Sequence, residues 1–203
     1  MWSTCSRARW LLVCAMAVVV QADARADDYR DLFGKGKQYV GLSLGSGVGF
    51  SMGFMGDGDG KDVNFFDLRP RYGVGVTDVL GEGHWYRGDI DFMLEGEFLF
   101  EFDGGTYQGL ALMFRYNFLR EGRLIPFVEL GSGMGNLDFD LDDQSDGFNF
   151  TPQLGIGFHY FVAERVSLNG ATRWHHISNA GTKHPNNSIN AFTFTVGATY
   201  FLE

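Results

Sequence analysis

The chain is poor in cysteine and proline, and it carries no excess of positive charge. It has 2 cysteines, 4 prolines and a net charge of -9 over 203 residues. The acidic balance disfavours nucleic acid as a partner, because phosphate binding requires clustered Lys and Arg. Because proline is scarce, the 29 glycines indicate neither a collagen nor a Pro/Gly-rich disordered chain. After the first 20 positions there is no apolar run of about 18 residues, which excludes helical membrane spans there.

Residues 1–26 have the features of a secretory signal peptide. Two arginines precede an apolar stretch over residues 10–20, and two small-x-small cleavage sites follow, ending at Ala24 and Ala26. A buried helix is the alternative, but the charged flank and the N-terminal position favour a signal. The sequence therefore predicts two parts, a cleaved signal over residues 1–26 and a single domain over residues 27–203.

Cleavage would remove every thiol from the protein, since Cys5 and Cys14 both lie in the predicted signal. Disulfide scaffolds, zinc-thiolate sites and cysteine nucleophiles are then excluded. Removal of three arginines and one aspartate would change the net charge from -9 to -11.

From residue 38 onward, large apolar residues alternate with small or polar ones. Between residues 40 and 54 the even positions are mostly large and apolar, and the odd positions are glycine or serine. A period of two indicates β-strands with two distinct faces, and glycine at every second position is unfavourable in a helix. The pattern predicts eight strands, at about 38–55, 63–78, 84–102, 106–119, 124–137, 147–162, 165–178 and 189–202.

Two all-β folds fit this pattern, a soluble sandwich and a membrane barrel. The strands are long, and many exceed the roughly 9–11 residues that cross a membrane. The less apolar face is rich in charge, which suits a barrel interior. The sequence therefore predicts an all-β fold, a closed eight-stranded antiparallel transmembrane β-barrel with even-numbered apolar residues facing lipid. Interior ion pairing is expected among odd-numbered residues: Asp89, Asp91, Glu95, Glu97, Arg69, Arg71, Arg87 and Arg115.

The connections predict the orientation of this barrel in the outer membrane. With both termini in the periplasm, the turns near residues 80–83, 120–123 and 162–164 are periplasmic and short. The connections on the outer side are then 56–62, 103–105, 137–147 and 179–188.

The clearest candidate for chemistry follows the seventh predicted strand. His176 and Ser178 share even parity with the apolar residues of that strand, so they are expected on the lipid-facing wall near its outer end. His175 has the opposite parity and is expected in the lumen. An interfacial histidine followed by a solvated loop is the alternative to a catalytic pair.

The segment around this pair resembles the lipid A 3-O-deacylase family (PagL family). The match consists of His-Ile-Ser-Asn-Ala-Gly over residues 176–181, then Lys183, a Pro-Asn step at 185–186 and a terminal strand. It covers only about residues 173–190. The resemblance implies an outer-membrane serine esterase that removes the ester-linked acyl chain at position 3 of lipid A. It also implies lipid A or lipopolysaccharide in the outer leaflet as the partner and a site on the outside of the barrel. A His/Ser mechanism requires no cofactor.

The resemblance assigns roles residue by residue. His176 becomes the general base and Ser178 the nucleophile, because a serine hydroxyl is a weak nucleophile unless a base activates it. The backbone of Gly181 and the side chain of Asn186 match the positions that form the oxyanion hole, whose donors stabilise the tetrahedral intermediate. The third triad position carries Asn190 where the best-known pattern has glutamate.

The change at Asn190 keeps two functions open. Its amide oxygen can accept the imidazole N–H, as in Cys-His-Asn sites, but it contributes no negative charge. The alternative is a non-enzymatic eight-stranded outer-membrane barrel with a structural, adhesin or protective role. The sequence does not decide between a monomer and a homodimer.

Two acidic segments are candidates for binding a divalent ion. Residues 57–62 form half of a calcium loop without the glutamate at its twelfth position, and five aspartates lie within 138–146. We interpret both as solvated acidic loops and assign no metal site. An ion bridging them to lipopolysaccharide phosphates is the alternative.

Overall fold

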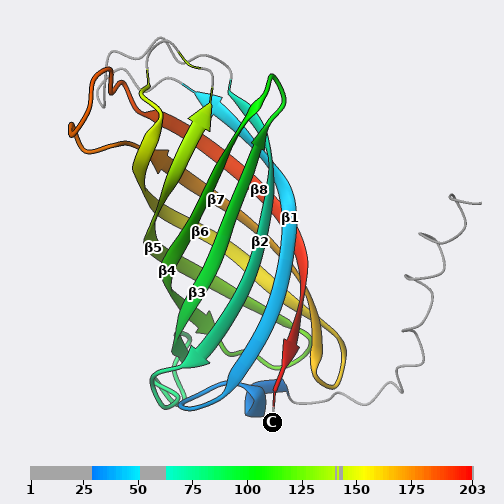
Figure 1. Ribbon diagram of the computed structural model, residues 1–203. Coiled ribbons are helices and arrows are strands. Elements are labelled where there is room, and N and C mark those ends of the chain that lie inside the picture. The colour runs from blue at the N-terminus through cyan, green and yellow to red at the C-terminus, as the bar shows by residue number, and fades with distance from the viewer. Residues whose placement is uncertain (1–28, 51–62, 140, 142–143, 203) are drawn as a thin grey trace, which may run out of the picture.

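The computed structural model describes residues 29–50, 63–139, 141 and 144–202. Its strands pair antiparallel with their sequence neighbours, and β1 also pairs with β8, so the sheet closes into a barrel (Figure 1). The predicted eight-stranded barrel is therefore confirmed. The strands are β1 (Gln38–Phe50), β2 (Asn64–Gly75), β3 (Gly88–Glu101), β4 (Gly105–Phe118), β5 (Leu124–Phe139), β6 (Gly147–Ala163), β7 (Val166–Ile177) and β8 (Ile189–Phe201).

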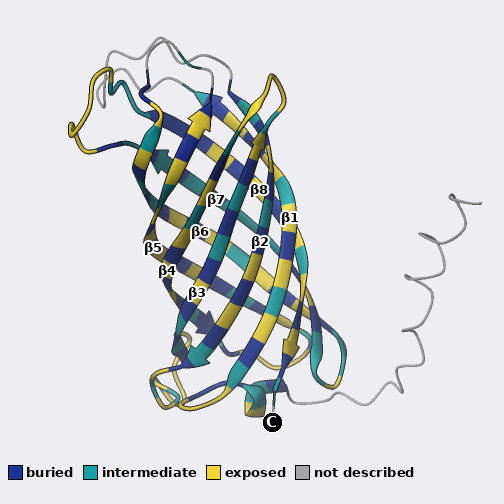
Figure 2. Cartoon of the chain, in the orientation of Figure 1, coloured by how far each residue is buried: buried dark blue, intermediate teal, exposed yellow. Residues whose placement is uncertain are grey.

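The two faces of the strands follow the predicted parity, and Figure 2 shows buried and exposed residues alternating along them. Leu110 is 58% exposed on the outer wall, and its neighbour Ala111 is fully buried in the barrel. Phe114 and Phe158, which a sandwich would place in its core, are 48% and 44% exposed. The apolar side chains thus face outward, as a barrel in lipid requires.

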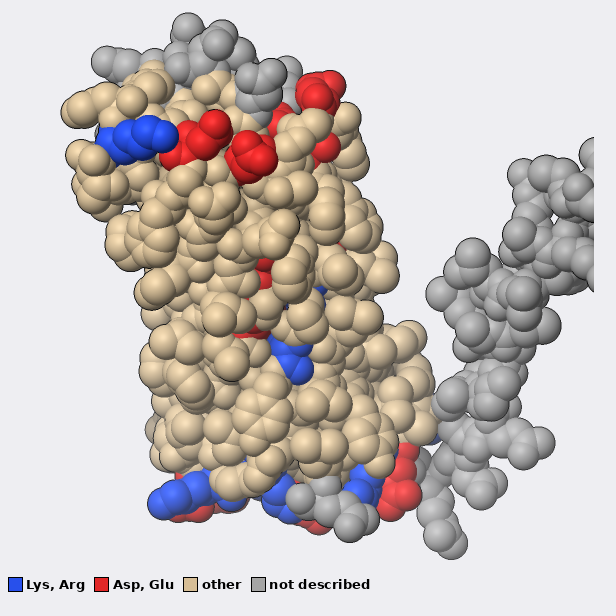
Figure 3. Space-filling model, viewed as in Figure 1, with Lys and Arg blue, Asp and Glu red and all other residues tan. Residues whose placement is uncertain are grey.

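Charged side chains are concentrated at the two ends of the barrel surface, as Figure 3 shows. Between them lies a mostly uncharged band in which a few charged atoms are visible, and it is formed largely by exposed aliphatic and aromatic side chains of the strands. A transmembrane barrel needs such an apolar band between its polar ends. In the described part of the chain, no helix has the length and apolar character to cross a membrane.

Ion pairs fill the middle of the lumen. Glu129 contacts Arg115 at 2.8 Å and Arg173 at 2.6 Å, and Arg173 reaches Glu95 at 2.8 Å. All four side chains are buried. Arg69 pairs with Asp67 in the same interior. The predicted interior pairing is confirmed for five of the eight residues, Glu95, Glu97, Arg69, Arg71 and Arg115. Asp89 and Asp91 are buried in the lumen as expected, but there they accept hydrogen bonds from Gly34, Tyr39 and Asn117. Arg87 lies outside the lumen.

The small residues of β1 make room for this interior. A Cβ at position 47 would overlap the ring of Phe65, which lies on the neighbouring strand β2. Ser43, on the same face, accepts a hydrogen bond from Arg71 at 2.7 Å. The glycine-rich face of the first strand therefore points inward and lets large side chains cross the lumen.

The N-terminal described residues close the lower end of the barrel in Figure 1, beside the C-terminus. The 3₁₀ helix η1 (Tyr29–Leu32) stacks Tyr29 on Phe161, with ring centroids 4.2 Å apart. The N–H of Gly34 then donates to Asp89 in the lumen at 2.7 Å. The β7–β8 connection lies at the opposite end.

Two details differ from the sequence-based expectations. The connection between β2 and β3 spans residues 76–87 and is not short, because an isolated bridge between Leu80 and Gly88 extends the pairing into a wide turn. Arg87 lies in this turn before β3 begins and pairs with Glu82 at 3.1 Å, so it is not an interior residue. An odd or even position predicts the inward or outward face of the barrel only for residues that are paired within the strands.

Several expectations concern residues outside the described ranges. They are the signal peptide at 1–26 with its cleavage sites, the end of the first strand beyond Phe50, the half calcium loop at 57–62 and part of the acidic segment 138–146. Among the described residues, no group of three or more His, Asp or Glu side chains is placed to hold a metal ion.

Candidate active site

His176 and Asn190 face each other across two neighbouring strands. His176 is the penultimate residue of β7, Asn190 is the second residue of β8, and the two are direct partners in the β-ladder. Direct partners place their side chains on the same face of the sheet. The imidazole Nδ1 lies 2.8 Å from the Asn190 Oδ1, and Asn190 is only 6% exposed. The ladder itself therefore aligns this pair.

An acceptor at Nδ1 determines the form of the imidazole. The Nδ1–H donates to the Asn190 oxygen, which leaves the lone pair on Nε2. Trp174 stands next to His176 on the same face, with ring centroids 5.8 Å apart. The histidine is thus held on the outer wall with Nε2 as its basic nitrogen.

Ser178 lies where β7 separates from β8. Its backbone still pairs with β6, through bonds of 2.8 and 3.0 Å to Phe150, while the ladder to β8 ends at Ile177 and Ile189. The Ser178 hydroxyl donates to the Asn186 Oδ1 at 3.2 Å. Serine and histidine share the outer face, but within the described part of the chain no hydrogen bond joins them. The Ser178 Oγ also accepts the backbone N–H of Ala180 at 3.3 Å.

Asn186 is brought to Ser178 by the loop. Its Oδ1 also accepts the backbone N–H of Asn179 at 3.1 Å. A backbone N–H can only donate, so this contact assigns the oxygen of the Asn186 amide to the side facing residues 178 and 179. The nitrogen of the same amide, Nδ2, takes part in neither of these two contacts.

Gly181 forms no hydrogen bond with Ser178 among the residues that the structure describes. Its N–H donates instead to the side-chain oxygen of Asn179 at 2.9 Å. Gly181 and Ala180 both have positive φ angles, of 75° and 55°. An alanine adopts this region rarely, so the turn after the serine is strained. For Gly181 to donate to a substrate, Asn179 has to release its N–H.

Asn179 was not singled out from the sequence, yet it organises this turn. Its side chain is 2% exposed and donates to the Lys183 carbonyl at 2.8 Å, in addition to accepting from Gly181. Its own carbonyl accepts from the Thr182 hydroxyl at 2.8 Å. The available signal was the odd parity of Asn179, which aims it away from the lipid face.

The structure places His175 in the lumen, as parity predicted. It is fully buried, with its Nε2 3.6 Å from a carboxylate oxygen of Glu97. His159 is also buried and lies 3.1 Å from Arg115 and 2.9 Å from Ser167. Neither histidine shares the outer wall with His176.

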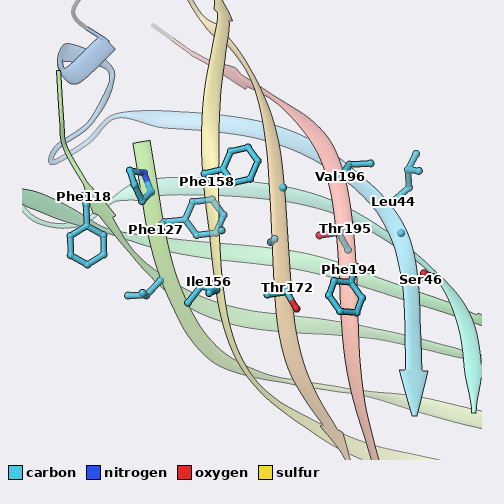
Figure 4. A pocket seen from close by; sticks show the side chains of 16 residues that line it. Leu44, Ser46, Phe118, Phe127, Ile156, Phe158, Thr172, Phe194, Thr195 and Val196 are labelled. Carbon is cyan, nitrogen blue, oxygen red and sulfur yellow. The ribbon is translucent and has the colours of Figure 1, made fainter. Parts of the chain in front are cut away.

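A shallow apolar depression of about 820 Å³ lies on the outer wall, and Figure 4 shows its lining. Residues of β1, β4, β5, β6, β7 and β8 form it, and most of them face outward. The small Gly170 and Thr172 of β7 lie between Phe158 and Phe194. Thr172 is four residues before His176 on the same face of β7. At about 3.3 Å per residue, the depression begins roughly 13 Å along the strand from the histidine.

A closed barrel with an apolar outer wall and a polar interior defines an outer-membrane β-barrel protein. The family model described as lipid A 3-O-deacylase (PagL) matches residues 66–199, which include His176, Ser178 and Asn190. The chain belongs to this family. Its members act on lipid A in the outer membrane.

Solved structures share the fold at low identity. The outer membrane enzyme PagL is 19% identical, with a TM-score of 0.54, over 78% of this chain and 97% of that one. Neisserial surface protein A is 14% identical, with a TM-score of 0.55, over 80% and 96%. The N-terminal barrel of Pseudomonas aeruginosa OprF is 12% identical, with a TM-score of 0.51, over 83% and 99%. No curated protein sequence matches the chain.

Proposed function

We propose that the protein is a serine esterase that hydrolyses the 3-O-linked acyl chain of lipid A. The observation that carries the proposal is the 2.8 Å contact between His176 and Asn190 on the lipid-facing wall, with Ser178 two residues further along. A polar pair on a lipid-facing wall is energetically costly, and such pairs in membrane proteins usually serve a function. Lipid A presents its ester bonds at the same depth, where sugar and acyl chains meet.

The reaction proceeds in two acyl transfers. Ser178 Oγ attacks the ester carbonyl carbon while its proton passes to His176 Nε2. The tetrahedral intermediate collapses, the sugar 3-oxygen leaves with the proton from His176, and the acyl group stays on Ser178. Water then attacks the acyl-enzyme, again with His176 as base, and the fatty acid and free serine are released. No cofactor takes part in this sequence.

The oxyanion of each tetrahedral intermediate requires donors. We assign this role to the Nδ2 of Asn186 and to the N–H of Gly181. The first lies on the amide that already faces Ser178, and the second becomes available when Asn179 releases it. Each oxyanion donor contributes about 3–4 kcal/mol to transition-state stabilisation in serine hydrolases.

The depression on the outer wall supports a lipid substrate. It continues the face of β7 below His176 and is almost entirely apolar, with exposed Phe194 and Ile156 at its sides. An acyl chain whose ester lies at Ser178 would extend along this wall toward the membrane centre. Shape and polarity there suit a hydrocarbon chain.

Mass spectrometry of lipid A tests the function directly. Cells that express the wild-type protein should produce lipid A lacking one ester-linked acyl chain, with the freed hydroxyl at position 3. Ser178→Ala should restore the full mass, while Ser132→Ala, a matched change at an exposed serine of β5, should not. Heat-modifiable gel mobility verifies that each barrel is folded.

A non-enzymatic role is the second candidate, favoured by one observation. Asn190 provides no carboxylate for His176, so the imidazolium of the transition state lacks a partner charge. A structural or adhesive barrel would leave lipid A unchanged in the same experiment.

We further propose that residues 1–26 direct export and are removed. The mass of the protein recovered from outer membranes should correspond to cleavage after Ala24 or Ala26. Failure of a maleimide reagent to label it would agree, because Cys5 and Cys14 are the only cysteines in the sequence.

A further inference from the structure

Residues 144–146, which precede β6, are bound to the loop that carries Asn186. Gln144, from the β5–β6 connection, forms an isolated antiparallel bridge with Asn186. Its side chain is 3% exposed, and its Oε1 accepts the backbone N–H of Ser188 at 2.9 Å. Gln144 therefore contacts the β7–β8 loop at Asn186 and two residues beyond it.

Neighbouring residues bind the other side of Asn186. The backbone N–H and the hydroxyl of Ser145 both donate to the Pro185 carbonyl, at 3.0 and 2.7 Å. Lys183 Nζ donates to the Asp146 carbonyl at 3.1 Å. Contacts from residues 144–146 thus reach residues on both sides of Asn186.

A backbone N–H, which can only donate a hydrogen bond, determines the orientation of the Gln144 amide. The Ser188 N–H can only donate, so the oxygen of Gln144 faces it and the nitrogen faces the other way. That nitrogen donates to the Asn149 Oδ1 at 2.8 Å, and the Asn149 nitrogen donates to the Gly147 carbonyl at 3.0 Å. Both amides are therefore held at each end, and the fully buried Asn149 connects the arrangement to β6.

Ser188 has a φ of 53°, a region that residues other than glycine adopt rarely. Its N–H bond to Gln144 helps to hold that backbone in place. The only polar contacts of the Asn186 side chain within the described residues are to Ser178 and Asn179, and both use its oxygen. The position of its Nδ2 therefore depends on where the loop backbone is held.

We infer that Gln144 is a positioning residue for Asn186, and that it holds the amide where its nitrogen can meet the oxyanion formed at Ser178. Gln144 itself does not touch the reacting atoms. This inference rests on the proposed esterase function. A displacement of about 1 Å in a donor lowers a rate up to about 100-fold, so the positioning contributes to turnover and not to lipid binding.

The test is a double-mutant cycle on the full-length protein in lipid A micelles. Gln144→Ala should lower kcat about 10- to 100-fold and change KM less than about twofold. Asn186→Ala should lower kcat about 100- to 1000-fold. The kcat of the double variant should equal that of Asn186→Ala to within about threefold, because without the Asn186 amide Gln144 has no side chain to position. Gln108→Ala, at an exposed glutamine of β4, is the matched control and should be unchanged.

Hydrogen exchange in lipid nanodiscs provides a readout that does not depend on activity. The amide of Ser188 should exchange slowly in the wild type and in Gln144→Glu, whose carboxylate still accepts this N–H, and faster in Gln144→Ala. Two outcomes would overturn the positioning role while the esterase function stands. One is a double variant whose loss in kcat is the product of the two single losses. The other is an exchange rate of the Ser188 amide that is equal in Gln144→Ala and in the wild type. A wild type that releases no acyl chain overturns both the esterase function and the inference, and exchange then reports only whether the contact exists.

Discussion

The backbone N–H of Asn179 donates to the side-chain oxygen of Asn186, 3.1 Å away, and this single contact orients the Asn186 amide. The Ser178 hydroxyl uses the same oxygen in the resting structure. The amide therefore has two separate parts, an oxygen that organises the loop and a nitrogen to which we assign the proposed oxyanion contact. The two parts can be separated by substitution.

Asn186→Asp keeps the acceptor and removes the donor. We expect the loop to retain its contact with Asn179, because a carboxylate oxygen accepts the same N–H. The lost donor and the new negative charge both oppose the oxyanion, so kcat should fall about 100-fold or more. Release of fatty acid from purified lipid A measures the rate. A rate within threefold of wild type would remove Asn186 from the oxyanion site.

Substitutions of Asn190 should reveal how the imidazole is supported. Asn190→Ala removes the acceptor for the His176 Nδ1–H, and we expect slower turnover. Asn190→Glu should keep or raise the rate, because a negative charge stabilises the protonated imidazole of the transition state. A wild type that is nearly inert until glutamate is introduced would contradict the contact through the Asn190 oxygen, because an amide nitrogen that donates to the ring selects the wrong tautomer. Deacylation by Asn190→Ala as fast as by the wild type would exclude Asn190 from the mechanism.

Thr172→Phe should fill the depression below the active site. Thr172 lies between Ile156 and Phe194 in the ladder, and an aromatic ring there would occupy the space proposed for the acyl chain. Turnover of long-chain esters should fall at least about tenfold, while short-chain esters react as before, since a single methylene is worth about 1–3 kcal/mol in an apolar pocket. Thr172→Val is the isosteric control. Equal losses for both chain lengths would show that the chain lies elsewhere.

Glu129→Leu tests the interior ion pairs. The substitution leaves Arg115 and Arg173 buried without the carboxylate that contacts both. Breaking a buried pair typically costs about 3–5 kcal/mol, so the free energy of unfolding in lipid vesicles should fall by about that amount. Glu121→Gln, in the exposed turn before β5, should have little effect. Urea titrations of the two variants and the wild type provide the measurement.

Parity predicted much of the site as well as the barrel. The even positions of His176, Ser178 and Asn190 predicted a common outer face, and the ladder places His176 opposite Asn190. Parity failed at Arg87, because the β2–β3 turn lies outside the ladder and no longer obeys a period of two. For Asn179 it indicated only a side chain aimed away from the lipid face, because the role of this residue depends on three hydrogen bonds within a strained turn.

The sequence by itself determined the strands, the face that each side chain occupies and the closed barrel, because a period of two is a local property that every residue repeats. Tertiary structure alone decided which groups meet in the loops. Gln144 and Ser188 are 44 positions apart, and their contact depends on two connections emerging side by side at one end of the barrel. The same holds for Glu129 and Arg173 in the lumen, where closure of the sheet brings opposite charges from β5 and β7 within 2.6 Å. Such contacts have no period along the chain, so only the folded barrel creates them.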